Sequence, residues 1–429
     1  MDKIDVVIVG GGLAGLSAAY RLCEAGRQVI LLERGDVPGS KNMTGGRLYV
    51  KPLKRYLPGL LDEAPFERPV VKEIITVLDE GKSFQTEYLN EQWRRPPYMS
   101  YTVLRAKFDG WLSEKVMEKG GFVIPRKRVD DLLWEDGRVA GVKVGGEEIP
   151  AQVVIAADGA LSFMGERAGL RTALTPGNYA VAIKEVYGLD EKIIEERFGL
   201  EDGQGAANLL AGSVTKGLFG GGFLYTNRES ISLGIVVGIG SLAGNHGGIE
   251  IHRLMEEFSA RPEVRRWIQG GELKEYSAHI ISEAGISGVS KLYAGGMLVA
   301  GDAAGFALNL GITVRGMDYA LASGAVAAEV ADEALAKGDF SAEFLSMYEQ
   351  KLKESFVLAD METFRHSKEV LENPRLFTVY PHFLCELLQT MFTVDEGPKA
   401  PLYGDAKKAA RKNILNWEGF KDFLMLRKM

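Results

Sequence analysis

The alternation of apolar and polar positions at the start of the chain predicts a strand, a tight turn and a helix. Residues 4–9 are a short apolar run of strand-forming residues, and helix-favouring residues begin at position 13. Gly10, Gly12 and Gly15 have the G-x-G-x-x-G spacing that joins strand to helix in dinucleotide-binding folds. Gly10 permits the turn, Gly12 allows backbone to approach a pyrophosphate, and Gly15 allows close helix packing.

The residues after this helix supply the context that a lone glycine motif lacks. Positions 28–32 predict a second buried strand, and Glu33 follows it. An acidic residue about 20 positions past the motif accepts the ribose hydroxyls in such folds. We therefore favour a dinucleotide site over the alternative, a helix-capping turn with a solvated Glu33.

The next segments predict a cofactor loop, a second sheet and a helix. The loop 34–48 is rich in glycine and polar residues, and Gly45 and Gly46 would allow backbone to lie against a flat ring. Residues 70–100 alternate strand-like runs with polar turns, and residues 101–116 have helical spacing. Arg105 stands near that helix start, where a cation opposes the helix dipole unless an anion lies nearby.

Strands of the first sheet then frame a β-excursion. Residues 122–125 predict a strand, and 129–144 predict a hairpin with its turn at Asp136 and Gly137. The buried run 153–157 returns to the parallel sheet. An excursion between nucleotide-fold strands favours a flavoprotein over a plain dehydrogenase.

The second half of the chain is first strand-rich and then helical. The strand-rich region, 172–285, contains the apolar, glycine-rich segment 217–225. This segment fits a glycine-rich hairpin and a binding site for an apolar ligand equally well. A further predicted strand ends at Gly301 and Asp302, close to the start of a helix. An Ala-rich helix is predicted at about 317–335. Its N-terminus could face a flavin as negative charge builds on reduction.

The chain from 341 on is predicted to be helical. Within it, we favour a core helix over a membrane-surface helix for 382–392, because a basic face is missing.

Composition narrows the class of protein. The 429 residues are 46% hydrophobic and 25% charged, enough for two or three domains, and the net charge of −7 argues against nucleic acid as the main partner. The two cysteines, Cys23 and Cys385, cannot form a disulfide framework or hold a four-thiolate cluster, which fits a reducing cytoplasm. We see no signal peptide, no apolar run of about 18 residues and no metal-ligand spacing.

These motifs together resemble the FAD-dependent group-2 aromatic hydroxylase superfamily, which includes geranylgeranyl reductases. The resemblance rests on the N-terminal glycine motif with Glu33, Arg105 before Phe108-Asp109, Asp158-Gly159 and the segment 301–305. Segments 39–47, 220–225 and 309–318 look closest to electron-transfer-flavoprotein:quinone oxidoreductases of FixC/EtfC type. The resemblance covers nearly the whole chain. The chain departs from the longer quinone oxidoreductases in lacking their C-terminal four-cysteine domain.

The resemblance implies FAD as the cofactor. It places Arg105 near the pyrophosphate or ribityl chain, Asp302 at the ribityl or pyrophosphate region, and residues 311–316 beside the isoalloxazine ring. The cofactor-binding candidates are Gly10, Gly12, Leu13, Ala14, Gly15, Glu33, Arg34, Gly45, Gly46, Arg47, Arg105, Val129, Ala157, Asp158, Gly159, Gly301, Asp302, Gly311, Thr313 and Val314. The substrate-binding candidates are Gly221, Gly222, Phe223, Leu224 and Tyr225. Catalytic residues are not assigned.

The expected fold is α/β, with a Rossmann-like FAD domain of the glutathione-reductase and p-hydroxybenzoate-hydroxylase type. We assign residues 1–70, 100–170 and 286–340 to it, 71–99 and 171–285 to an inserted β-sheet domain for substrate or quinone, and 341–429 to a helical region.

The function that the resemblance implies is electron transfer from the α and β subunits of electron transfer flavoprotein, directly or through a ferredoxin-like iron–sulfur subunit, to a membrane quinone. The chain would be the quinone-reducing subunit of a FixABCX/EtfABCX-type complex that could bifurcate electrons, peripheral on the inner face of the cell membrane. A polyprenyl reductase, an aromatic monooxygenase and a non-catalytic FAD scaffold are the alternatives.

Overall fold

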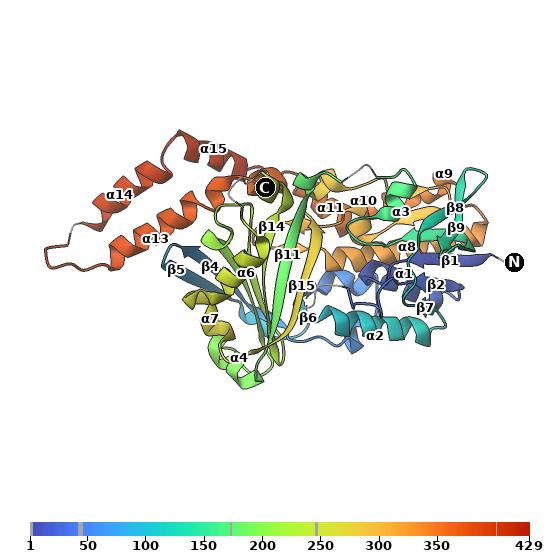
Figure 1. The fold of residues 1–429 in the computed structure, drawn as a ribbon, viewed down its shortest axis with the longest axis horizontal. Helices are drawn as coiled ribbons and strands as arrows, with labels where there is room; N and C mark the ends of the chain where they lie inside the picture. Colours follow the sequence, from blue (N-terminus) through green and yellow to red (C-terminus); the bar gives the residue numbers. More distant parts are fainter. Residues whose placement is uncertain (1–2, 42–45, 172–173, 245–247, 400) are drawn as a thin grey trace.

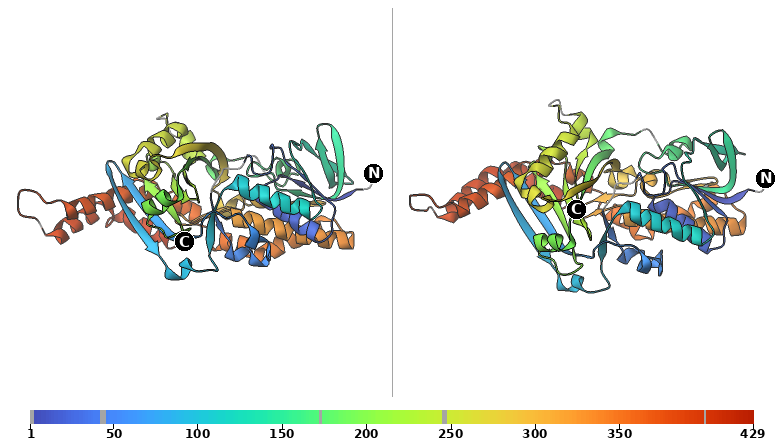
Figure 2. Two further views of the ribbon diagram at one scale, coloured as in Figure 1. Left: turned by 90° about the horizontal axis from the view of Figure 1, so that it is seen from below. Right: turned by 60° about the horizontal axis from the view of Figure 1, so that its bottom comes forward.

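The protein is elongated, with its N-terminus at one end and a group of C-terminal helices at the other (Figure 1). The computed structural model describes residues 3–41, 46–171, 174–244, 248–399 and 401–429. Two sheets lie between the ends, and Figure 2 shows them as separate bodies from two further directions. The ligand site depends on how the two sheets meet.

The first sheet is the predicted Rossmann-like one. Its order is β16-β17-β10-β1-β2-β7, and β1, β2, β7, β10 and β17 run parallel. A hairpin of β8 and β9 continues antiparallel into β10, which is the predicted excursion. The strands are β1 (Ile4–Val9), β2 (Val29–Leu32), β7 (Phe122–Ile124), β8 (Asp131–Glu135), β9 (Arg138–Val144), β10 (Glu147–Ala156), β16 (Tyr293–Ala294) and β17 (Met297–Val299).

The second sheet has seven strands in the order β15-β11-β14-β13-β12-β4-β5. Neighbouring strands of this sheet are antiparallel, except that β4 and β12 are parallel. The strands are β4 (Val70–Asp79), β5 (Lys82–Leu89), β11 (Tyr179–Gly188), β12 (Gly205–Gly212), β13 (Gly220–Thr226), β14 (Ser230–Gly238) and β15 (Glu272–Ser282). Two small ribbons pair β3 (Gly46–Tyr49) with β6 (Ser100–Val103), and β18 (Leu308–Asn309) with β19 (Val314–Arg315).

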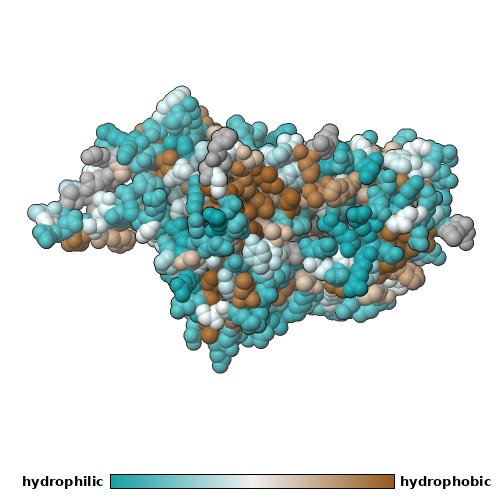
Figure 3. Space-filling view, in the orientation of Figure 1, coloured by the Kyte–Doolittle hydropathy of each residue, from teal (hydrophilic) through white to brown (hydrophobic). Residues whose placement is uncertain are grey.

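Each sheet has its own hydrophobic core. The first core joins β1, β2, β10 and β17 to the helices α1 (Leu13–Glu24), α2 (Arg105–Glu118) and α8 (Met317–Lys337). The second joins one face of the seven-stranded sheet to α4 (Glu191–Phe198), α6 (Ile251–Ala260) and α7 (Pro262–Ile268). The opposite face of that sheet stays free of these helices. Figure 3 shows hydrophobic residues gathered near the middle of the molecule, where the two sheets approach each other.

The C-terminal region is helical, as predicted. Its helices are α9 (Ala342–Leu345), α10 (Met347–Lys353), α11 (Phe356–Thr363), α12 (Ser367–Leu371), α13 (Val379–Phe392), α14 (Leu402–Asn413) and α15 (Trp417–Leu426). The remaining helices are α3 (Phe163–Arg167) and α5 (Ile239–Ala243). Within the described residues, none of the helices is both long enough and apolar enough to cross a bilayer.

The prediction of an ordinary core helix over 382–392 is correct for only part of α13. Pro381, Phe383 and Cys385 are buried against the second sheet. The far end projects into solvent together with α14, and Phe392 is 79% exposed (Figure 1). The sequence pattern had identified the apolar residues of this helix but not the point at which the sheet stops covering them.

Replacement of Gly15 by Ala tests the predicted close packing of α1. A Cβ at this position would stand 2.0 Å from the carbonyl oxygen of Gly10, which is backbone and has no room to move. We expect Gly15→Ala to lower the free energy of unfolding by about 1–3 kcal/mol, measured by urea unfolding of the apoprotein.

Gly110→Ala is the matched control, because Gly110 lies within α2 and a Cβ there would meet nothing within 4 Å. This change should leave stability unaltered or raise it by up to about 1 kcal/mol. Equal shifts in the two variants would contradict the packing argument.

Candidate functional site

One large cavity lies where the carboxyl end of the first sheet meets the face of the second sheet that α4, α6 and α7 leave free. Its volume is about 1380 Å³. A single small-molecule site usually occupies about 300–1,000 Å³. The cavity is therefore large enough for a dinucleotide and a second ligand.

The turn from β1 to α1 closes one end of this cavity. Gly10 has a φ of +106°, and a Cβ there would stand 2.3 Å from the carbonyl oxygen of Ala157 at the end of β10. A Cβ on Gly12 would meet nothing within 4 Å, so the backbone is open toward the cavity. The first turn of α1 points its N–H groups from this position, which is the geometry that binds phosphate at a helix N-terminus.

Glu33 stands at the end of β2 and is held by two backbone donors. Gly11 N–H donates to its Oε2 at 2.8 Å, and Gly35 N–H donates to its Oε1 at 2.5 Å. An ionised carboxylate can accept about four hydrogen bonds. Glu33 therefore keeps acceptor capacity toward the cavity that it lines, which suits the ribose hydroxyls of a dinucleotide.

Asp158 offers a further polar group beyond the turn. Its Oδ2 accepts the Met164 N–H at 2.9 Å, while its Oδ1 is buried and has no hydrogen-bond partner among the residues that the structure describes. Burial raises the pKa of this carboxyl to about 6. A buried acceptor without a partner is costly, and a hydroxyl-bearing cofactor in the cavity would satisfy it.

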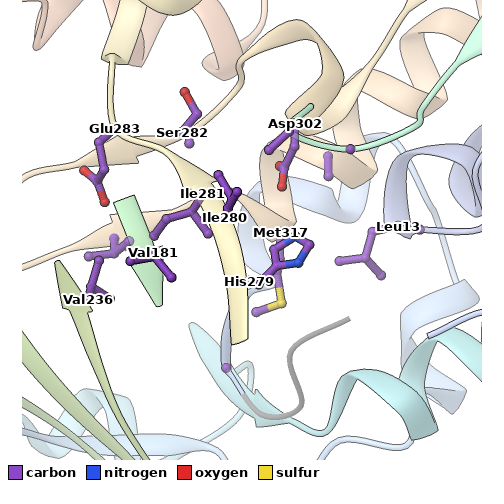
Figure 4. Close-up of a pocket in the computed structure, with 18 of the residues that line it drawn as sticks. Leu13, Val181, Val236, His279, Ile280, Ile281, Ser282, Glu283, Asp302 and Met317 are labelled. Carbon is purple, nitrogen blue, oxygen red and sulfur yellow. The ribbon is translucent and has the colours of Figure 1, made fainter. Parts of the chain in front are cut away.

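The middle of the cavity gathers a cation, a carboxylate and a histidine. Arg105 donates to Asp109 from Nε at 2.8 Å and from Nη2 at 2.7 Å, so the anion that its helix position requires lies one turn further on. Burial raises the pKa of Asp302, and the nearby charges of His279 and Arg105 oppose this rise. Burial also acts on His279, where it lowers the pKa because it disfavours the charged form of the ring. Figure 4 shows His279 and Asp302 on the side of the cavity toward Leu13 of α1.

The other end of the cavity is apolar. β13 contributes Gly221, Gly222, Phe223 and Tyr225 to the lining. Opposite it, the segment after α12 returns to the sheet, and the rings of Phe219 and Phe377 meet edge to face at 6.0 Å between centroids. Other apolar residues at this end are Ile281, Ile312, Leu371 and Leu376.

Most of the predicted site residues lie together on the cavity wall. These are Gly10, Gly12, Leu13, Ala14, Glu33, Arg34, Gly46, Arg47, Arg105, Val129, Ala157, Asp158, Gly159, Asp302, Gly311, Val314, Gly221, Gly222, Phe223 and Tyr225. Gly45 lies outside the described residues. Gly15, Gly301 and Thr313 do not line the cavity. Gly15 and Gly301 instead provide room for close packing, because a Cβ on Gly301 would stand 2.7 Å from the Cβ of Ala14.

Leu224 requires a correction, because it does not reach the cavity. Successive residues of a strand point to opposite faces of the sheet. Phe223 points into the cavity, so Leu224 points into the second core, where it is fully buried. The predicted substrate segment therefore contributes alternate side chains rather than a continuous run.

The sequence analysis missed His279, Glu283 and Phe377, which also line the cavity. The strand period of two over 272–282 could have placed His279 and Ile281 on one face. Nothing local marked Phe377, because only the path of the C-terminal helices returns it to the sheet. Among the described residues, no cluster of three or more His, Cys, Asp or Glu side chains could hold a metal ion.

Comparisons with known proteins agree with this geometry. Residues 5–174 match the FAD dependent oxidoreductase family, and residues 367–429 match the ETF-QO/FixC family C-terminal domain. The chain is 45% identical over 424 residues to the probable electron transfer flavoprotein-quinone oxidoreductase YdiS of Escherichia coli K12, with 98% of each chain covered. This chain belongs to the ETF-QO/FixC family.

More distant relatives extend the same result. Protein FixC of Azotobacter vinelandii is 36% identical, with 95% of this chain and 94% of that protein covered. Among solved structures, a geranylgeranyl bacteriochlorophyll reductase-like protein from Thermoplasma acidophilum matches with a TM-score of 0.72 at 23% identity, covering 97% of this chain and 98% of that one. The myxobacterial chondrochloren halogenase CndH matches with a TM-score of 0.62 at 18% identity, covering 97% of this chain and 90% of that one.

These findings confirm the predicted fold class and FAD as the cofactor of this ETF-QO/FixC family member. The chain is an FAD-dependent oxidoreductase of the electron-transfer-flavoprotein:quinone oxidoreductase type. The site fits this cofactor, because the β1–α1 turn offers an open backbone and a helix N-terminus, and Asp158 after β10 offers an acceptor without a partner among the described residues.

Replacement of Glu33 by Gln tests its role in holding FAD. An amide cannot accept from both Gly11 and Gly35 without turning an NH₂ group toward one of the two donors. Hydrogen bonds to a charged group contribute about 1.5–3 kcal/mol. We expect Glu33→Gln to weaken FAD binding by about tenfold or more, measured by fluorescence titration of the apoprotein.

Asp36→Asn is the control in the same loop, because Asp36 is exposed and pairs with Arg126 at the surface. This variant should bind FAD like the wild type. Equal affinity of the Glu33→Gln protein would remove Glu33 from the cofactor site.

Proposed function

We propose that this protein takes electrons from the α and β subunits of electron transfer flavoprotein, directly or through a ferredoxin-like iron–sulfur subunit, and passes them to a membrane quinone. The observation that carries the proposal is the single cavity that runs from a dinucleotide-binding turn to an apolar pocket. The relative YdiS is described as an electron transfer flavoprotein-quinone oxidoreductase, which supports this reading. We propose that it does so as the quinone-reducing subunit of a FixABCX/EtfABCX-type complex of the electron-bifurcating kind.

FAD supplies the redox chemistry when bound, since a flavin accepts electrons singly and delivers them in pairs. The role that we propose for the protein itself is to bind the cofactor and the quinone within one enclosed space. We propose that Gly10, Gly12 and Glu33 hold the ADP half, and that Arg105 and Asp302 lie along the linking chain. Gly311 and Val314 would then border the ring.

The quinone would occupy the apolar end. Phe223 lies on the cavity face of β13, and its ring packs over Gly234 of β14, where a Cβ would stand 2.4 Å from the ring. The absence of a side chain at Gly221, two residues before Phe223 on the same face of β13, leaves a flat surface of backbone beside this ring. Such a surface suits a planar, largely apolar headgroup.

The C-terminal helices provide a route to the membrane that holds the quinone. α15 exposes Trp417, Phe420 and Phe423, which are 67%, 50% and 58% exposed. α14 exposes the basic residues Lys407 and Arg411. Aromatic side chains beside basic ones are typical of helices that lie in a membrane interface. We propose that α13–α15 rest on the inner face of the cell membrane, next to the apolar end of the cavity that the α12–α13 segment lines.

Anaerobic stopped-flow spectroscopy tests the electron path. The oxidised holoprotein is mixed with reduced electron transfer flavoprotein and its ferredoxin-like subunit, and separately with NADPH, before a water-soluble quinone is added. We expect fast bleaching of the flavin by the flavoprotein and reoxidation by the quinone. Bleaching by NADPH alone, with no reaction with quinone, would contradict the proposal and favour a reductase or monooxygenase.

Two neighbouring residues separate the quinone site from the core in this assay. Phe223→Ala should raise the KM for quinone several-fold and leave FAD content unchanged, because it removes a cavity wall. Leu224→Ala is the control on the opposite face and should cost about 2–5 kcal/mol of stability without changing that KM. The same KM in both variants would remove β13 from the quinone site.

Flotation with vesicles of phosphatidylethanolamine and phosphatidylglycerol tests the membrane contact. The triple variant Trp417→Ser, Phe420→Ser, Phe423→Ser should reduce the bound fraction at least tenfold, since each buried aromatic side chain contributes about 1.5 kcal/mol or more. The control, Phe122→Ser with Trp134→Ser, changes exposed aromatic residues of the first sheet. Equal binding by both variants would contradict the assignment of α15.

A further inference from the structure

Glu283 is a buried carboxyl group in the cavity, away from the dinucleotide-binding turn. It follows the last residue of β15, is 8% exposed and lines the cavity. In Figure 4 its carboxylate is directed toward the strands that carry Val181 and Val236. The other carboxylate that the figure labels, Asp302, lies on the side of the cavity toward Leu13 of α1, as His279 does. Glu283 therefore belongs to the end of the cavity where we place the quinone.

Within the described residues, the hydrogen bond to the Glu283 side chain comes from a neutral amide and not from a cation. The side-chain amide of Asn309 donates to its Oε2 at 3.1 Å. Burial raises the pKa of the Glu283 carboxyl to about 7, and the Asn309 hydrogen bond and the charge of Lys368 oppose this rise. Near neutral pH the group is thus divided between its acid and its carboxylate forms, which is the condition for an efficient proton donor.

Hydrogen bonds link the backbone of Glu283 through Asn178 to a partly exposed lysine of α12. The Glu283 N–H donates to the carbonyl oxygen of Asn178 at 2.9 Å, and the Lys368 ammonium donates to the Oδ1 of the same Asn178 at 2.7 Å. Lys368 also pairs with Glu372 at 3.7 Å, and its side chain is 23% exposed. Lys368 is thus a partly exposed cation whose charge acts on the Glu283 carboxyl.

Other charged groups on the neighbouring elements are directed elsewhere. On the β18–β19 ribbon that carries Asn309, Arg315 donates to Asp318 and Asp360. β15 carries His279, and the charges that act on this ring include those of Asp302 and Arg105 on other elements. Lys368 of α12 is the charged side chain that acts on the Glu283 carboxyl.

We propose that Glu283 is the proton donor to the quinone carbonyl at the apolar end of the cavity. This inference rests on the proposed function. Reduction of a quinone to a quinol adds two electrons and two protons, and forms one O–H bond at each carbonyl oxygen. Bound FAD in its reduced form would supply the two electrons and one of the two protons. The second proton comes from the Glu283 carboxyl, which becomes a carboxylate and recovers its proton from solvent on the Lys368 side.

Single-turnover oxidation of the photoreduced holoprotein tests the assignment with two acceptors. A short-chain ubiquinone takes electrons and protons, whereas ferricenium takes electrons alone. Glu283→Gln keeps the shape of the side chain and the contact with Asn309 but cannot act as an acid. We expect it to react about 100-fold more slowly with the quinone and at the wild-type rate with ferricenium, while Glu283→Asp recovers part of the quinone rate.

The pH dependence adds a second signature. The wild-type quinone rate should fall as pH rises through about 7, because the acid form of Glu283 is lost, and the Gln variant should lack this step. Glu369→Gln is the control, since Glu369 lies on α12 but pairs with Lys428 at the surface. It should behave as the wild type with both acceptors.

Urea unfolding supplies a readout that does not depend on turnover. The folded protein keeps the Glu283 proton up to about pH 7, whereas an unfolded chain loses it near the ordinary value of 4.5. The folded state therefore binds more protons in this window, and this group's contribution to stability declines as pH rises through it. The difference between wild type and Glu283→Gln should follow that decline.

The outcomes are distinguishable. Failure of the wild type to reduce quinone, with normal reaction with ferricenium, would overturn the proposed function and the role of Glu283 with it. Normal quinone reduction by Glu283→Gln would overturn the proton donor alone. Equal slowing of this variant with both acceptors would mean that Glu283 supports the fold around the cofactor, and would also overturn the donor assignment.

Discussion

The structure depends on backbone atoms that approach each other at the turn between β1 and α1. A side chain on Gly10 would collide with the end of β10, and a side chain on Gly15 would collide with Gly10 itself. These contacts hold the carboxyl ends of two parallel strands and the start of one helix at a single point. Gly324 of α8 adds a third approach, because a Cβ there would stand 2.1 Å from the carbonyl oxygen of Ala14. The direction of α1 follows from this packing, and with it the place where phosphate can bind.

The cavity begins at this point and changes character along its length. The dinucleotide end has a helix N-terminus, Glu33 and the acceptor of Asp158 that has no partner in the described structure. The middle has Arg105 and Asp302, whose opposite charges partly offset the cost of burying them. The far end has aromatic and aliphatic walls from β13 and the segment after α12. A polar cofactor and an apolar acceptor can thus share one enclosed space, which is what transfer between them requires.

The protonation of Glu283 depends on the same arrangement of charged groups in the cavity. In the described part of the cavity, Arg105 binds Asp109 and Arg315 binds Asp318, so these cations are occupied within the chain. Glu283 is in a different situation, since its direct side-chain contact is the neutral amide of Asn309. Burial then favours the protonated form of the carboxyl group. A carboxylic acid facing an apolar pocket is useful where the substrate gains protons together with electrons.

The sequence by itself determined the features that are local in the chain. The glycine spacing, the strand before it and Glu33 after the next strand define one βαβ unit, so their consequence does not depend on distant residues. The excursion at 129–144 and the helix at 317 followed for the same reason, because each has its own periodicity. The motifs also sufficed to indicate FAD and the family.

Only the tertiary structure decided which side chains share the cavity. The segment 217–225 looked uniformly apolar, yet the sheet turns Phe223 toward the cavity and Leu224 into the core. Phe377 and Glu283 gave no local signal, because they meet the site through the path of α12 and the end of β15. α13 was expected to be a core helix, and the edge of the second sheet determined where its burial stops. Periodicity shows which residues share a face of an element, but what covers that face depends on segments far away in the chain.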